Sequence, residues 1–111
     1  MRLDATIEGG QQITIGTIVV LSYDWREVSG QTFSISTASA QLFDEDNTEV
    51  IASTTAEVTS GINLAPRTQV TFTAVQTSAL TVGSGYYVRW TLVLGDGQTR
   101  IVRGSIYVRN A

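Results

Sequence analysis

Apolar and polar residues alternate most regularly near the end of the chain, over residues 84–110. The apolar parity of the first half consists of Tyr86, Val88, Trp90, Leu92 and Leu94. The apolar parity of the second half consists of Val102, Gly104, Ile106 and Val108. Successive side chains of a strand point to opposite faces of a sheet. The alternation therefore predicts a β-hairpin whose even-numbered side chains belong to the core.

The connection of this hairpin decides which residues face each other. A two-residue turn would set Trp90 opposite Arg103 and drive a guanidinium into the core, at a cost of several kcal/mol. That cost exceeds any turn preference. We therefore predict a connection of odd length, or a bulge, that pairs Leu92 with Val102 and Trp90 with Gly104.

The opposite parity of the hairpin carries a different set of side chains. Its large members are Tyr87, Arg89, Arg103, Tyr107 and Arg109. Aromatic residues and arginine are enriched where proteins touch one another. We identify these five residues as candidate protein contacts, with their guanidinium groups available to a neighbour. An ordinary solvated strand face is the alternative interpretation.

The rest of the chain also favours strands over helices. β-branched residues are frequent, and no window of eleven or more residues keeps an apolar helical period. Strands are predicted over 12–22, 32–43, 48–56 and 68–76, with a weaker segment over 57–65. The first changes its alternation at Gly16, which indicates a bulge or a change of sheet. In the 68–76 strand, Val70, Phe72 and Ala74 share one face, and Val70 and Phe72 are assigned to the core.

Six or seven short strands separated by turns are typical of an antiparallel sandwich or a small barrel. The 111 residues suffice for one domain, which we place at 12–111. Residues 1–11 show little periodicity and are interpreted as an N-terminal arm. The chain contains no run of about 18 apolar residues, so the sequence predicts no membrane span. The first ten residues lack the apolar region of a signal peptide.

The composition excludes several classes of site and of function. The chain contains neither histidine nor cysteine, which excludes disulfides, zinc fingers and imidazole catalysis. Its net charge of −3 disfavours nucleic-acid binding. All seven basic residues are arginine. Two explanations are open: a GC-rich genome, or selection for residues that suit protein interfaces.

Three patterns in the sequence contain residue types that can carry chemistry. Asp44, Asp46 and Thr48 alternate in "DEDNTE", but a solvated turn is favoured over a calcium loop because the required glycine and distant glutamate are missing. Asp24 and Glu27 could act as an acid–base pair, but nothing in the sequence indicates the cleft that such a pair requires. The glycines of "VGSGYY" and "LGDGQT" follow no nucleotide-binding pattern. We predict no catalytic, metal-binding or cofactor-binding residue, and therefore no cofactor and no enzyme.

A further pattern concerns the start of the hairpin. Leu80, Gly85 and Tyr87 resemble the Leu…Gly-x-Tyr pattern of immunoglobulin-like domains, in which a tyrosine bonds the backbone at a corner. The alternation places Tyr86, rather than Tyr87, on the buried side. Either tyrosine is a candidate for this role.

Two segments resemble proteins of tailed-phage virions. "YYVRWTLVLGDGQTRIVRGSIYV" is similar to the closing hairpin of virion immunoglobulin-like domains, and "YDWREVSGQTFSISTASAQLF" is similar to a segment of phage fibre–tail adaptor proteins. The resemblance spans about residues 20–109. Gln31 stands where those proteins usually have aspartate.

The resemblance implies an immunoglobulin-like antiparallel β-sandwich of about seven strands. It also implies a non-enzymatic structural protein of the virion tail, neck or fibre attachment, made in the host cytoplasm. Its partners would be other virion proteins, in an oligomeric assembly, with neither nucleic acid nor membrane. Two alternatives are a capsid decoration (cement) protein and a carbohydrate-binding β-sandwich, for which Trp25 is the available aromatic platform.

Overall fold

A computed structural model describes residues 2–8, 12–60 and 65–110, and this part contains eight strands and one short helix. In chain order the elements are β1 (Leu3–Glu8), β2 (Gln12–Thr14), β3 (Val19–Glu27), β4 (Ile35–Phe43), β5 (Glu49–Ser60), β6 (Pro66–Phe72), α1 (Ala74–Ser78), β7 (Gly83–Leu94) and β8 (Thr99–Arg109). The predicted all-β class is confirmed, with one strand more than expected. No helix in these ranges is long and apolar enough to cross a membrane.

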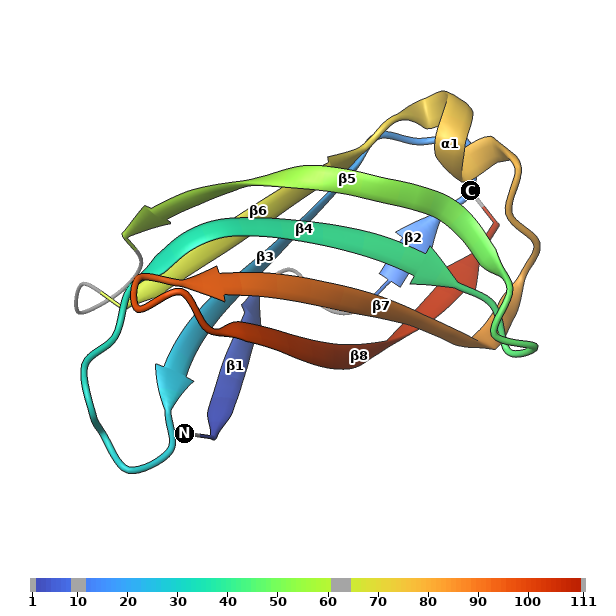
Figure 1. The fold of residues 1–111 in the computed structure, drawn as a ribbon. Coiled ribbons are helices and arrows are strands. Elements are labelled where there is room, and N and C mark those ends of the chain that lie inside the picture. Colours follow the sequence, from blue (N-terminus) through green and yellow to red (C-terminus); the bar gives the residue numbers. More distant parts are fainter. Residues whose placement is uncertain (1, 9–11, 61–64, 111) are drawn as a thin grey trace.

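The strands form one hydrogen-bonded sheet that curls into two facing layers (Figure 1). The strand order is β1-β3-β6-β5-β4-β7-β8-β2, and every pair is antiparallel except β2 with β8. β5 joins the layers because residues 49–56 pair with β4 while residues 57–60 pair with β6. The result is an immunoglobulin-like β-sandwich.

The sequence left a bulge or a change of sheet open at Gly16, and the structure shows the change of sheet. β2 pairs with β8 in one layer, whereas β3 pairs with β1 and β6 in the other. Gly16 has φ +80°, a left-handed conformation that glycine adopts without a steric penalty. It lies in the turn between the two strands, so one predicted strand becomes two. A second irregularity is a register shift between β4 and β7, which lies between Ile35 and Thr37.

Both layers contribute to one core. An aromatic cluster occupies it: the ring centroid of Tyr23 lies 5.6 Å from that of Trp25 and 5.1 Å from that of Trp90. Of the residues assigned to the core from the sequence, the structure buries Val70, Phe72, Tyr86, Val88, Trp90, Leu92, Ile106 and Val108. Val102 is half-buried. β2 covers the edge of β8 only along 107–109, so the inner side near Val102 stays partly open.

The hairpin has the predicted faces and an odd-length connection, but the predicted residue pairs are wrong. The Leu94 N–H donates to the Gln98 carbonyl and the Gly97 N–H donates to the Leu94 carbonyl, which leaves a three-residue loop with Gly97 at φ +89°. Trp90 consequently lies opposite Val102 rather than Gly104. The prediction used Gly104 to make room for the indole. In the structure, the space above Gly104 holds the hydroxyl of Tyr23 from the opposite layer.

Two further expectations need correction. Most of the predicted arm is strand β1, because Leu3, Ala5 and Ile7 alternate with polar residues and pack against the core. Residues 1 and 9–11 of that segment lie outside the described part. The strand predicted over 68–76 ends at Phe72, and the region around Ala74 is helical.

The helix begins at a capping box that the sequence contains. The hydroxyl of Thr73 accepts a hydrogen bond from the backbone N–H of Gln76, and the Gln76 side chain accepts one from the N–H of Thr73. This reciprocal arrangement is a recognised signal for a helix start. The predicted strand overlooked it because Val75 continues the β-like composition.

Candidate functional site

The outward side of β4, β7 and β8 carries the predicted contact residues, together with two that were missed. We call this surface the arginine face; it consists of Phe43, Tyr87, Arg89, Ile101, Arg103, Tyr107 and Arg109. β-strand alternation places these side chains opposite the core, since their neighbours Val88, Trp90, Ile106 and Val108 are buried. The structure thus gathers all five predicted contact residues on one side of one layer.

Two aromatic rings form the centre of the arginine face. Phe43 and Tyr87 are cross-strand partners, and their rings stack with centroids 5.1 Å apart at 8°. The guanidinium carbon of Arg89 lies 4.8 Å from the Phe43 centroid, and that of Arg103 lies 4.9 Å from the Tyr87 centroid. Such cation–π contacts contribute about 0.5–1 kcal/mol at exposed sites. They hold the two guanidinium groups flat against the sheet.

Side-chain hydrogen bonds fix the same groups. Arg89 donates to the Gln41 Oε1 from Nε at 3.2 Å and from Nη2 at 2.7 Å, and the Gln41 amide in turn donates to Glu49. Arg109 donates to the Oε1 of Gln12 at 3.3 Å. The expectation of available guanidinium groups is therefore wrong for Arg89 and Arg109, which already have amide partners. Arg103 is exposed and rests on the Tyr87 ring.

Sequence reasoning missed two members of the arginine face. Ile101 has 61% of its surface exposed, beside Arg103 on β8. Its odd position already placed it with the outward set, but apolar character argued against choosing it. Phe43 faces outward because it alternates with the buried Leu42 and lies opposite Tyr87, and with Arg89 over its ring only 9% of its surface is exposed. Its apolar character gives no sequence signal for the outward side.

The corner at the start of β7 is closed by Tyr86. Its hydroxyl accepts a hydrogen bond from the backbone N–H of Thr81 at 3.2 Å and lies 3.0 Å from the Thr81 hydroxyl. Leu80 is buried beside it. Tyr86 is therefore the tyrosine that bonds the backbone a few residues upstream, as in immunoglobulin-like domains. Tyr87 instead donates from its hydroxyl to the Asn47 side chain at 3.1 Å, on the outer surface.

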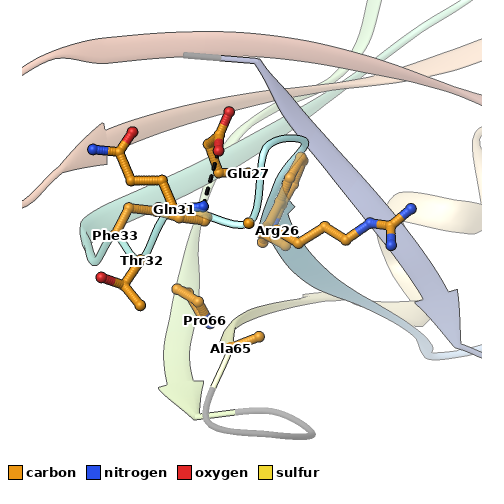
Figure 2. Close-up of a pocket in the computed structure, with 9 residues that line it drawn as sticks. Arg26, Glu27, Gln31, Thr32, Phe33, Ala65 and Pro66 are labelled. Atoms are coloured by element: carbon orange, nitrogen blue, oxygen red, sulfur yellow. Dashed lines mark hydrogen bonds between the residues drawn. The ribbon is translucent and has the colours of Figure 1, made fainter.

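An open pocket of about 370 Å³ lies at the opposite end of the molecule from the helix, beside the connection after β3. Figure 2 shows Gln31, Thr32 and Phe33 on one side of it and Ala65 and Pro66 near the other. The Arg26 side chain extends away from it. No group of three or more histidine, cysteine, aspartate or glutamate side chains suited to a metal ion occurs in the described ranges.

The carboxylate of Glu27 organises the wall of this pocket. It accepts hydrogen bonds from the Ser29 hydroxyl, the Ser29 N–H at 2.9 Å and the Gln31 N–H at 3.1 Å. The Ser29 hydroxyl bond and then the backbone bonds hold the pKa of Glu27 below its ordinary value. Glu27 thus has a structural explanation: it fixes the connection between β3 and β4.

The other residues considered for chemistry also have structural partners. Asp24 is bound by Arg67, whose Nε lies 2.7 Å and Nη2 3.0 Å from its two oxygens. One oxygen of Asp44 accepts the N–H groups of Asp46 and Thr48, each at 2.9 Å, which closes the turn between β4 and β5. Trp25 was expected as an aromatic platform. It is fully buried and donates from Nε1 to the Thr68 hydroxyl at 2.8 Å, so that expectation is wrong.

No family model and no curated protein matches the sequence. Among solved structures, the chain is similar to CopC from Methylosinus trichosporium OB3b, with 12% identity, a TM-score of 0.54, and coverage of 96% of this chain and 95% of that one. It is also similar to the sporulation control protein Spo0M from Bacillus subtilis, with 16% identity and a TM-score of 0.53 over 97% of this chain. The match spans 49% of the Spo0M chain. Murine CRIg gives 11% identity and a TM-score of 0.43, with 100% and 99% coverage. At identities this low, the likeness to CopC and to part of Spo0M shows a shared fold and nothing more.

Proposed function

We propose that this chain is a non-enzymatic structural component of a phage virion, at the tail, neck or fibre attachment. It acts through protein–protein contacts made by the arginine face. The observation that carries the contact surface is the row of outward side chains on β8, where Ile101, Arg103 and Tyr107 are all exposed. Aromatic and arginine side chains are enriched at protein interfaces, and the exposed Ile101 beside Arg103 adds apolar area to them.

Two further features support this proposal. The guanidinium groups of Arg89 and Arg103 are held on aromatic rings before any partner arrives, which reduces the side-chain entropy lost on binding. The resemblance of residues 20–109 to phage fibre–tail adaptor proteins and virion immunoglobulin-like domains supplies the virion setting. The carbohydrate-binding alternative loses its aromatic platform, because Trp25 is buried.

The test is localisation in purified particles of the phage that encodes the chain. Immunogold labelling and quantitative mass spectrometry should find it at the tail, neck or fibre base in a fixed copy number. Labelling spread over the capsid surface would assign it instead as a decoration protein. Absence from particles produced in its presence would refute the virion role.

The role of the arginine face is tested separately, by measuring how much of each variant is incorporated into phage particles. The double variant Ile101→Ser/Arg103→Ser should reduce incorporation at least tenfold. The matched control Ile18→Ser/Arg26→Ser alters the same residue types at positions outside the arginine face; Ile18 is 68% exposed and the Arg26 side chain 71%. Equal incorporation of both double variants would exclude the arginine face as the contact.

A further inference from the structure

Charge is divided unequally along this chain. Residues 83–110 contain four arginines and one aspartate, a formal charge of +3. Residues 1–82 contain the other three arginines and nine acidic residues, a formal charge of −6, and the two parts together give the −3 of the whole chain. The hairpin of β7 and β8 is therefore a basic element in an acidic protein.

The chain does not neutralise this element internally. Among the described residues, arginine–carboxylate ion pairs occur at Arg26 with Asp4 and at Arg67 with Asp24. The hairpin arginines contact amides, a backbone carbonyl or aromatic rings, and within the described ranges no carboxylate oxygen lies within 4.0 Å of them. Guanidinium groups pair with carboxylates in a bidentate geometry, so a partner with carboxylates satisfies them best.

The most concentrated carboxylates of the same chain lie in the turn between β4 and β5. We call the segment with Asp44, Glu45, Asp46 and Glu49 the acidic turn. Asp44 closes the turn, and Glu49 accepts from Gln41, whereas Glu45 and Asp46 are exposed. Figure 1 shows this turn at one end of the elongated molecule, where it is able to reach another copy.

We propose that the arginine face binds the acidic turn of a second copy of this chain, in a head-to-tail contact centred on Arg103. The proposal rests on the proposed function, because it names the partner of the same face. The Tyr87 hydroxyl binds Asn47 and so holds the acidic turn beside the arginine face of its own copy, yet within the described ranges no carboxylate of the turn forms an ion pair with Arg103. The charge complementarity of the two surfaces is therefore left for a contact between copies.

A head-to-tail contact fits the charges better than a face-to-face dimer. Arg89 and Arg103 are direct cross-strand partners, so two arginine faces placed against each other would bring four guanidinium groups together. Like charges placed together in this way oppose association. When each copy offers its arginine face to one neighbour and its acidic turn to another, the contact is heterologous and builds a ring or a filament. Either outcome suits a protein that is repeated around a virion axis.

The test uses two variants that each damage one surface. Arg103→Ser removes the central guanidinium, and Glu45→Gln/Asp46→Asn removes the exposed carboxylates. In sedimentation velocity at about 0.05 M NaCl, the unaltered chain should form species beyond a dimer, and these should dissociate at about 0.5 M because salt screens exposed charges. Each variant alone should associate at least tenfold more weakly.

Mixing the two variants distinguishes head-to-tail from face-to-face contact. The intact turn of Arg103→Ser meets the intact arginine face of Glu45→Gln/Asp46→Asn, so the mixture should form a dimer that grows no further. The controls Arg26→Ser and Glu57→Gln change the same charges elsewhere and should associate like the unaltered chain. A face-to-face dimer would not recover on mixing, and that result would overturn the proposal.

The two proposals fail separately. An unaltered chain that stays monomeric at low salt and high concentration overturns the head-to-tail contact, while its presence at the tail or neck still supports the virion role. Conversely, a chain that self-associates through Arg103 but never enters particles overturns the virion role and leaves the self-association intact.

Discussion

Replacing Gly104 by alanine tests the central contact between the two layers. A methyl group built on Gly104 would lie 2.6 Å from the hydroxyl oxygen of Tyr23, well inside van der Waals contact. The backbone itself tolerates alanine, because Gly104 is not among the positive-φ glycines. The effect of the substitution is therefore decided by the tyrosine that stands over it.

Tyr23 has little freedom to move away. It is 2% exposed, and its ring packs against those of Trp25 and Trp90, which are both fully buried. Overpacking of a close-packed core costs about 1–3 kcal/mol. We expect Gly104→Ala to lower the free energy of unfolding by about 2 kcal/mol, or to lower the Tm by about 8 °C in a domain of this size.

The reasoning is checked by removing the oxygen that causes the clash. The Tyr23 hydroxyl is buried and has no hydrogen-bond partner in the described ranges, so Tyr23→Phe should change stability by less than about 1 kcal/mol. In that background the methyl group meets the ring carbon Cζ at 3.5 Å, an ordinary contact. Alanine also reduces the entropy of the unfolded chain relative to glycine, by about 0.4–1 kcal/mol.

The assay is a double-mutant cycle measured by urea unfolding, with equal m values as the check on two-state behaviour. We expect Gly104→Ala to be near neutral in the Tyr23→Phe background, which gives a coupling energy of about 2 kcal/mol between the two positions. If Gly104→Ala costs the same free energy in both backgrounds, the hydroxyl is not the obstacle and the described packing of the two layers is wrong.

Three other predictions follow from single side chains. Tyr86→Phe removes both hydrogen bonds of the corner and should cost about 1 kcal/mol, whereas Tyr107→Phe, on an exposed tyrosine, should change stability by less than about 0.5 kcal/mol in the same thermal melts. The pKa of Glu27 is lowered in the folded state, so its carboxylate stabilises the fold above the ordinary pKa, and this stabilisation is lost as the pH falls through the lowered pKa. Glu27→Gln should therefore be less stable than the unaltered chain at pH 7. The difference between the two unfolding curves should shrink at acid pH. Burial raises the pKa of Tyr23, so the unfolded chain ionises first and stability falls as the pH rises above about 10; Tyr23→Phe should reduce that alkaline loss, and an unchanged pH profile would count against the buried hydroxyl.

The sequence predicts those strands in which one face is buried and the other is exposed to solvent. In β7 and β8 every second side chain enters the core, and the parity of Trp90 and Ile106 follows from alternation alone. Gly16 marks the change of layer because the alternation shifts there. The exact register does not follow, since a shift by two residues keeps every side chain on its face. What fixes the register is the three-residue loop and the Tyr23 hydroxyl above Gly104, and the latter is a contact between strands about 80 positions apart.

The candidate site was only partly predictable for a similar reason. The outward parity of β7 and β8 identifies Tyr87, Arg89 and Arg103, because these positions lie within one hairpin. Their partners come from β4, at Gln41 and Phe43, and depend on which strand lies beside β7. That neighbour is determined by the topology of the whole sheet, which local periodicity does not contain.

The stability of the hairpin does not explain why the arginines are where they are. Arg89 and Arg103 occupy directly opposite positions, where like charges are unfavourable and an opposite pair would contribute about 0.2–1 kcal/mol. The chain has ten acidic residues, yet none lies on the outward side of β7 or β8. Stacking on Phe43 and Tyr87 offsets the repulsion without neutralising the charge. A surface that keeps its positive charge at some expense of stability is better explained by what it binds than by how it folds, and carboxylates of another copy satisfy that charge.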